Sequence, residues 1–70
     1  MSVARVVEIS STSSKSFEDA IAQGVDRANK TLRNVKSAWV KEQEAEVDHG
    51  KISAYKVNLK VTFVLDGEPV

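Results

Sequence analysis

The stretch that decides the fold lies near the end of the chain and reads Ile52-Ser53-Ala54-Tyr55-Lys56-Val57-Asn58-Leu59-Lys60-Val61-Thr62-Phe63-Val64-Leu65. Apolar and polar residues alternate along it, which is the pattern of a β-strand with one buried face. The apolar side consists of Tyr55, Val57, Leu59, Val61, Phe63 and Leu65, and the polar side of Lys56, Asn58, Lys60 and Thr62. The sequence therefore predicts one long strand over residues 52–65.

This strand is too long for the chain that contains it. At about 3.3 Å per residue it would span roughly 45 Å. A compact domain of 70 residues has a radius of gyration of only about 11 Å. Long strands around a single helix also leave unpaired edges, which invite pairing with another chain. We therefore expect a closed symmetric homo-oligomer.

A second strand and a tight turn are predicted directly upstream. Residues 36–48 also alternate, and Asp48-His49-Gly50-Lys51 fits a turn because Gly50 accepts a positive φ. We expect a hairpin in which Asp48 faces Ile52. An unbulged register from that point pairs four further positions, namely Glu44 with Lys56, Glu42 with Asn58, Trp39 with Val61 and Ser37 with Phe63.

The first half of the chain predicts one strand and one helix. Residues 2–10 are expected to form the strand, with Val3, Val7 and Ile9 on one face and Val6 on the other, and the serine-rich run 10–16 is expected to be a loop. Ser16 is the expected helix N-cap, and Asn34 suits a left-handed stop. The helix carries one apolar stripe formed by Phe17, Ile21, Val25, Ala28, Leu32 and Val35. Gly24, in mid-helix, either permits close approach of a strand or is simply tolerated.

Composition narrows the classes of function. The chain has no cysteine and one histidine, so disulfides and multi-histidine zinc sites are excluded and a partner chain is the remaining means of stabilising so small a domain. Ten basic and ten acidic residues are interspersed, which argues against nucleic-acid binding. No apolar run reaches the ~20 residues of a membrane span, and residues 1–5 lack a signal-peptide pattern. We expect a single cytoplasmic domain over residues 1–70, with residues 66–70 as a tail.

No residues form a catalytic constellation. His49 sits in the predicted turn, and no nucleophile or acid is placed beside it, so we do not expect an enzyme. The acidic series of the second strand, Glu42, Glu44, Glu46 and Asp48, has the oxygen ligands that calcium prefers. Carboxylates on alternate residues lie ~6.6 Å apart, which is too far for one ion without help from another chain or loop. We therefore assign no metal ligands.

Several segments in order resemble the dodecin family over nearly the whole chain. They are Val6-Val7-Glu8-Ile9, Thr12-Ser13, Ser16-Phe17-Glu18-Asp19-Ala20, Lys30-Thr31-Leu32-Arg33-Asn34-Val35, Val40-Lys41-Glu42-Gln43, Ala54-Tyr55-Lys56-Val57 and Val61-Thr62-Phe63-Val64-Leu65-Asp66. The resemblance implies an α+β fold of β-α-β-β order, with a three-stranded antiparallel sheet wrapped around one helix. It also implies a hollow homododecamer of cubic-type symmetry that binds and stores flavin.

The residues that hold ligands in this family are different here. The family's flavin-stacking tryptophan corresponds to Ser37, and Trp39 lies two residues later. A glutamine that bonds the flavin ring edge in archaeal members corresponds to Lys56. Two arginines that hold phosphate groups in bacterial members correspond to Glu44 and Val64.

Two functional hypotheses follow. In the first, the chain is a non-catalytic dodecin-like homododecamer that binds FMN, riboflavin, FAD or a related small aromatic ligand, with Trp39 stacking and with Ser37 and Lys56 lining the pocket. In the second, it is a structural or calcium-stabilised assembly of the same kind without flavin.

Overall fold

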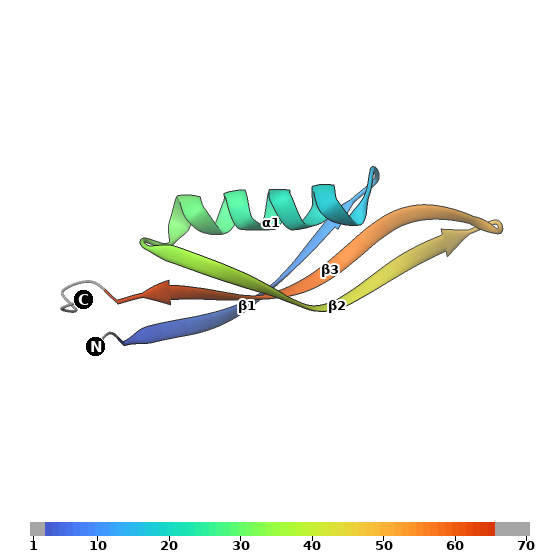
Figure 1. The fold of residues 1–70 in the computed structure, drawn as a ribbon. Helices are drawn as coiled ribbons and strands as arrows, with labels where there is room; N and C mark the ends of the chain where they lie inside the picture. The colour runs from blue at the N-terminus through green and yellow to red at the C-terminus, as the bar shows by residue number, and fades with distance from the viewer. Residues whose placement is uncertain (1–2, 66–70) are drawn as a thin grey trace.

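The structure is a computed structural model that describes residues 3–65 of the chain. Its elements are β1 (Ala4–Ser13), α1 (Phe17–Thr31), β2 (Val35–Asp48) and β3 (Lys51–Val64). The strands form one antiparallel sheet in the order β1-β3-β2, and α1 lies along one face of this sheet (Figure 1). The predicted β-α-β-β fold is confirmed. Ser2, the predicted start of the first strand, and the predicted tail at residues 66–70 lie outside the described residues.

The core lies between α1 and the central strand β3. Val57, Leu59 and Val61 are fully buried there, as the alternating pattern predicts. The helix meets them with a row of small residues, Ala20, Gly24 and Ala28. A Cβ on Gly24 would lie 2.9 Å from Leu59 Cδ1 and 3.2 Å from Ser11 Cβ. Gly24 therefore permits a close approach of the helix to the sheet.

The helix begins where the sequence predicts and ends earlier than its apolar stripe suggests. The side chain of Ser16 accepts a hydrogen bond from the Asp19 backbone N–H at 2.9 Å, so the predicted N-cap is confirmed. The last helical residue is Thr31, and Val35 already belongs to β2. Asn34 has a φ of 63°, which is the left-handed conformation expected of it. This residue redirects the chain from the helix into the sheet.

The first strand is longer than predicted. β1 continues through the serine-rich run to Ser13, which pairs with Tyr55 of β3. Ser13 is buried, its hydroxyl donates to the Asp19 carboxylate, and it accepts the Lys15 backbone N–H at 2.9 Å. The prediction of a loop at residues 10–13 was wrong. The backbone of β3 supplies pairing partners for these residues, and with such partners even a polar run adopts an extended conformation.

The β2–β3 register is interrupted by three bulges. Glu44 pairs with Lys56 and Glu42 with Asn58, as predicted. Between Val40 and Glu42 the strand β2 contains one extra residue, Lys41, and the register shifts by one position. Two predicted pairs beyond this bulge were therefore wrong, because Trp39 pairs with Lys60 rather than Val61, and Ser37 with Thr62 rather than Phe63.

The hairpin end also differs in register from the prediction. The third bulge lies between Glu46 and Val47, so that Asp48 faces Lys51 and Val47 faces Ile52. The two turn residues between the strands, His49 and Gly50, have φ values of 51° and 76°. Positive φ at both central residues is the signature of a type I′ turn, whose twist matches that of the flanking strands. The predicted turn is therefore confirmed.

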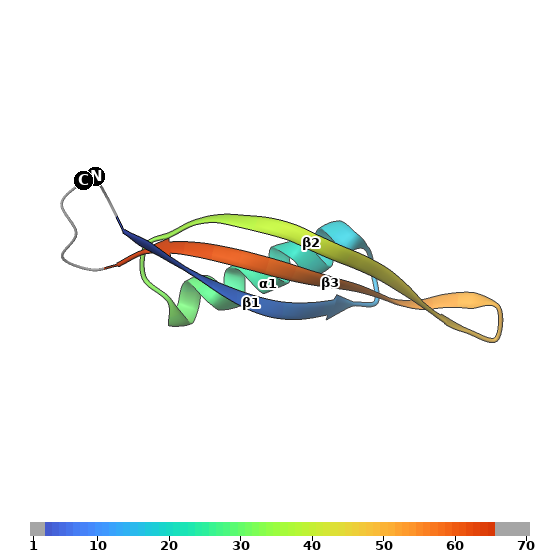
Figure 2. The ribbon, with the colours of Figure 1, turned by 90° about the horizontal axis from the view of Figure 1, so that it is seen from below.

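The described chain is elongated. Its extents are 52 × 19 × 13 Å and its radius of gyration is 14.3 Å, well above the ~11 Å of a compact chain of this size. The length comes from the β2–β3 hairpin, which projects beyond β1 and the start of α1 (Figure 2). Every residue from Lys41 to Ser53 is exposed. Of the helices in residues 3–65, none is long and apolar enough to cross a membrane.

Candidate functional site

The candidate site lies on the outer face, which we define as the face of the sheet opposite α1. Trp39 projects from β2 onto this face, and 64% of it is exposed. The ammonium of Lys60, on the neighbouring strand, lies 5.3 Å from the centroid of the Trp39 ring. Such a cation–π contact helps to hold the indole in place, and its interaction energy is modest. The arrangement presents a large aromatic surface to any planar molecule that reaches the sheet.

A second cation is fixed on the same face by a bulge. Lys41 is the extra residue of β2, and its ammonium reaches across β3 to Glu8 of β1 at 3.0 Å. The hydrogen bond to Glu8 raises the pKa of Lys41. Lys60 lies directly opposite Glu8 in the β1–β3 register, but within residues 3–65 its ammonium forms no ion pair and lies over the Trp39 ring.

Farther along the hairpin, polar side chains line a small hollow that we call the hairpin pocket. Its volume is about 330 Å³, and it is lined by Glu42, Gln43, Glu44, Lys56 and Asn58. The Asn58 amide donates to the Glu42 carboxylate at 2.8 Å. Carboxylate and amide oxygens suit a hard cation, while the Lys56 ammonium opposes one. Across the described residues, no three acidic or histidine side chains come close enough to hold a metal ion.

The three residues predicted to bind ligand do not form one cluster within a single chain. Ser37 and Trp39 lie on the outer face, opposite Thr62 and Lys60 of β3 respectively. Lys56 belongs to the hairpin pocket, and its separation from Lys60 along the strand is ~13 Å by the rise per residue. Within one chain, Trp39 and Lys56 would therefore contact different parts of a ligand. They would contact the same part of a ligand only if two chains of an assembly each supplied one of them.

Two residues of the outer face were missed by sequence reasoning. Lys60 is the neighbour of Trp39 because of the Lys41 bulge, and Lys41 itself turns onto the outer face for the same reason. Neither strand carries a glycine at that point to indicate the bulge. The one available signal is the change of alternation at Val40-Lys41-Glu42, where an apolar residue is followed by two charged ones.

His49 is exposed at the tip of the hairpin, and its Nδ1 lies 3.1 Å from the Asp48 carboxylate of the same turn. Within residues 3–65, the sheet and helix define a class of small β-α-β-β protein whose outer face carries an accessible aromatic ring and whose hairpin extends into solvent.

Comparison with known proteins agrees with this class. The family model for dodecins matches residues 3–66. The calcium dodecin of Mycobacterium tuberculosis is 38% identical over 63 residues, which cover 90% of this chain and 89% of that protein. The chain belongs to the dodecin family.

Solved structures of dodecins share the fold. The dodecin from Streptomyces davaonensis superimposes with a TM-score of 0.88 at 35% identity, with 93% of this chain and 96% of that chain covered. The crystal structure of the calcium dodecin from Mycobacterium tuberculosis, a calcium-chelating antigen with a novel calcium-binding site, gives a TM-score of 0.79 at 38% identity. That match covers 99% of this chain and 100% of the calcium dodecin chain.

Proposed function

We propose that this dodecin is a non-catalytic, cytoplasmic homododecamer that binds and stores flavin or a related small aromatic molecule, and that Trp39 supplies the stacking surface. The observation that carries the proposal is the exposure of Trp39 on the outer face. A large ring left 64% exposed forfeits much of the free energy that burial would give it. Covering it with a second planar ring recovers that free energy and adds a stacking contact.

The family supports this proposal, although its usual ligand residues are replaced. Ser37 stands at the position of the stacking tryptophan, and Trp39 is displaced from it by two residues on the same face. A step of two residues along a strand is about 6–7 Å. We expect the ligand to be shifted along the outer face by a similar distance, toward Lys60.

A fluorescence titration of riboflavin and of FMN with the purified oligomer tests this proposal. Trp39 is the only tryptophan of the chain, so both the flavin emission and the intrinsic protein emission report on the same contact. We expect stoichiometric quenching of flavin at micromolar protein. W39F should keep a stacking ring and most of the affinity, whereas W39A should lose it by tenfold or more, about 1.4 kcal/mol. Equal flavin affinity of W39A and the wild type would contradict the assignment.

The hairpin pocket supports a second candidate, a calcium-stabilised assembly without flavin. The relative described as a calcium dodecin covers nearly the whole chain. Glu42 and Glu44 offer carboxylates in the hairpin pocket, and further oxygen ligands would come from a neighbouring chain.

Thermal melting tests the calcium candidate. A cation that binds only the folded protein raises the melting temperature in proportion to the logarithm of its concentration. We expect calcium at large excess, compared with equal magnesium, to raise the melting temperature of the wild type but not of the E42Q/E44Q variant. Identical melting in calcium and in chelator would remove this candidate.

A further inference from the structure

The indole of Trp39 has a lysine beside it on the outer face. β2 is an edge strand of the sheet, so within residues 3–65 the strand next to Trp39 is β3, which places Lys60 directly opposite. The Lys60 ammonium lies over the indole, 5.3 Å from the centroid of the ring. A planar ligand that stacks on the other face of the indole would therefore lie close to a cation.

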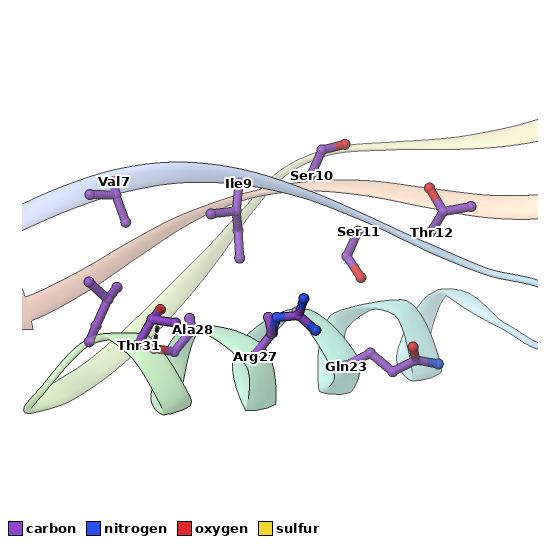
Figure 3. A pocket seen from close by; sticks show the side chains of 11 residues that line it. Val7, Ile9, Ser10, Ser11, Thr12, Gln23, Arg27, Ala28 and Thr31 are labelled. Atoms are coloured by element: carbon purple, nitrogen blue, oxygen red, sulfur yellow. Dashed lines mark hydrogen bonds between the residues drawn. The ribbon is translucent and has the colours of Figure 1, made fainter.

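Lys60 has a carboxylate opposite it in the register but not at ion-pair distance. Glu8 of β1 is its partner on the side of β3 away from Trp39. Figure 3 shows Val7 and Ile9 pointing from β1 into the groove of about 570 Å³ between β1 and α1. Glu8 lies between them in sequence and therefore faces the outer side, as Lys60 does. Opposite charges at facing positions normally attract, yet within residues 3–65 the Lys60 ammonium forms no ion pair.

The bulge of β2 supplies a different partner for Glu8. Lys41 is the extra residue of β2, and its ammonium lies 3.0 Å from the Glu8 carboxylate. The next carboxylate along β2, that of Glu42, accepts a hydrogen bond from the Asn58 amide at 2.8 Å in the hairpin pocket. Both carboxylates thus have partners other than Lys60.

We propose that Lys60 is a specificity-determining residue of the site at Trp39, and that it selects planar aromatic ligands that carry an anionic group over neutral ones. Lys41 is a positioning residue in this arrangement, because it holds the Glu8 carboxylate that would otherwise attract Lys60. The inference deepens the proposed function and rests on it, since it requires that a planar ligand stacks on Trp39.

The Lys60 side chain can serve both the indole and the ligand. A cation–π contact at an exposed site is weak, whereas a hydrogen bond between an ammonium and a phosphate or carboxylate is charge-assisted and stronger. The four-carbon stem of lysine is flexible, so the ammonium can turn from the indole to an anionic group while the ring of the ligand stacks. One such charge pair in contact with water corresponds to about a fivefold change in affinity.

Riboflavin and FMN are a matched pair of probes, because they differ only in the terminal phosphate of FMN. Flavin fluorescence titrations with the purified oligomer give the ratio of their dissociation constants, and this ratio separates the charge from the stacking contact that both flavins share. We expect the wild type to bind FMN about fivefold more tightly than riboflavin. K60R should keep this preference, whereas K60Q should bind both flavins with about equal affinity. Loss of riboflavin binding in K60Q would show that Lys60 supports the stacking contact itself and would contradict this role.

The matched control is K30Q, which removes one positive charge from α1, on the other side of the sheet. It should leave the ratio unchanged. Added salt should lower the FMN preference of the wild type but not alter the ratio for K60Q, because exposed charges are screened beyond about 8 Å at physiological ionic strength. A purely structural role of Lys60 would not produce this salt dependence.

A separate set of variants tests the positioning role of Lys41. In K41A the Glu8 carboxylate has lost its partner and should attract Lys60, so the FMN preference should fall by about half or more. K41A/E8Q, which also lacks the competing carboxylate, should recover the preference. In the K60Q background, K41A should leave the ratio unchanged, because Lys41 acts through Lys60. A change of the ratio in that background, or no recovery in K41A/E8Q, would contradict the positioning role.

The same titrations separate this inference from the proposed function. Equal affinity of the wild type for riboflavin and FMN, or an FMN preference that K60Q retains, would overturn the role of Lys60 and leave flavin binding intact. Binding of neither flavin would contradict the proposed function and this inference with it.

Discussion

At the scale of single residues, the join between β1 and α1 is made by Ser13 and Asp19. The Ser13 hydroxyl donates to the Asp19 carboxylate, and so does the Gln23 side-chain amide. The hydrogen bond from Ser13 is the principal cause that lowers the pKa of Asp19, and that from Gln23 adds to it. A carboxyl whose pKa is lowered by folding stabilises the folded state when it is ionised, and this stabilisation is lost as the pH falls through its folded pKa.

This linkage predicts a pH-dependent effect of S13A. The variant should melt at a lower temperature than the wild type at neutral pH, and the difference should shrink as the pH falls and Asp19 becomes protonated in both proteins. Thermal melts between neutral and strongly acidic pH measure it. The neighbouring Ser14 is exposed and forms no side-chain hydrogen bond in the described part of the chain, so S14A is the matched control. A difference for S13A that is independent of pH would contradict the role of Asp19.

Residue-level sequence reasoning succeeded where the chemistry is local. The N-cap at Ser16 and the left-handed Asn34 follow from side-chain type alone. The burial of Ser13 could not be predicted, because it depends on β3, which is distant in sequence. The cross-strand partner of Trp39 was predicted wrongly, because it is determined by one extra residue in the strand, Lys41.

At the scale of elements, the hairpin turn offers a clear test of backbone conformation. His49 and Gly50 are both in the left-handed region, at φ values of 51° and 76°. Asparagine tolerates this region much better than histidine, and asparagine–glycine is the preferred pair of a type I′ turn. We therefore expect H49N to stabilise the fold by up to about 1 kcal/mol, measured by chemical denaturation.

The control for this prediction is H49A, which removes the imidazole and its contact with Asp48. It keeps a Cβ at a residue with positive φ and therefore keeps the backbone strain. It should not be more stable than the wild type. If H49A gained as much as H49N, the gain would come from loss of the imidazole and not from the turn geometry.

The sequence located the strands of the hairpin correctly but did not predict their full pairing register. Alternation located β3 and the hairpin, and the pairs Glu44–Lys56 and Glu42–Asn58 were correct. The bulge at Lys41 shifted the pairs from Val40 to Ser37 by one position, and a further bulge between Ser37 and Val35 shifted the pair of Val35 by a second position. The only sign of this bulge in the sequence is the change of alternation at Val40-Lys41-Glu42, because its extra residue forms a long-range ion pair between Lys41 and Glu8 and not a local turn.

At the scale of the whole molecule, the 52 Å length of the described residues 3–65 is the dominant feature. Sequence alone indicated this length, because a strand of 14 residues is longer than a compact chain of this size. The groove between β1 and α1 could not be predicted, since it is formed by residues from two elements whose spacing depends on Gly24.

The proposed homo-oligomer should lose stability on dilution. We expect the melting temperature to rise with protein concentration over two orders of magnitude, because association stabilises the folded state by mass action. Calorimetry at several concentrations measures it. A melting temperature independent of concentration, together with a single-chain mass by light scattering, would show that each chain is stable alone.

The two ends of the described chain meet at one place, with consequences for its response to force. The Leu65 backbone N–H donates to the Val3 carbonyl at 3.1 Å, and β1 runs antiparallel to β3 from that point (Figure 2). Tension applied through these residues would load the β1–β3 ladder one rung at a time, instead of shearing all its hydrogen bonds together. The protein should therefore unzip under small pulling forces even if its assembled form resists heat.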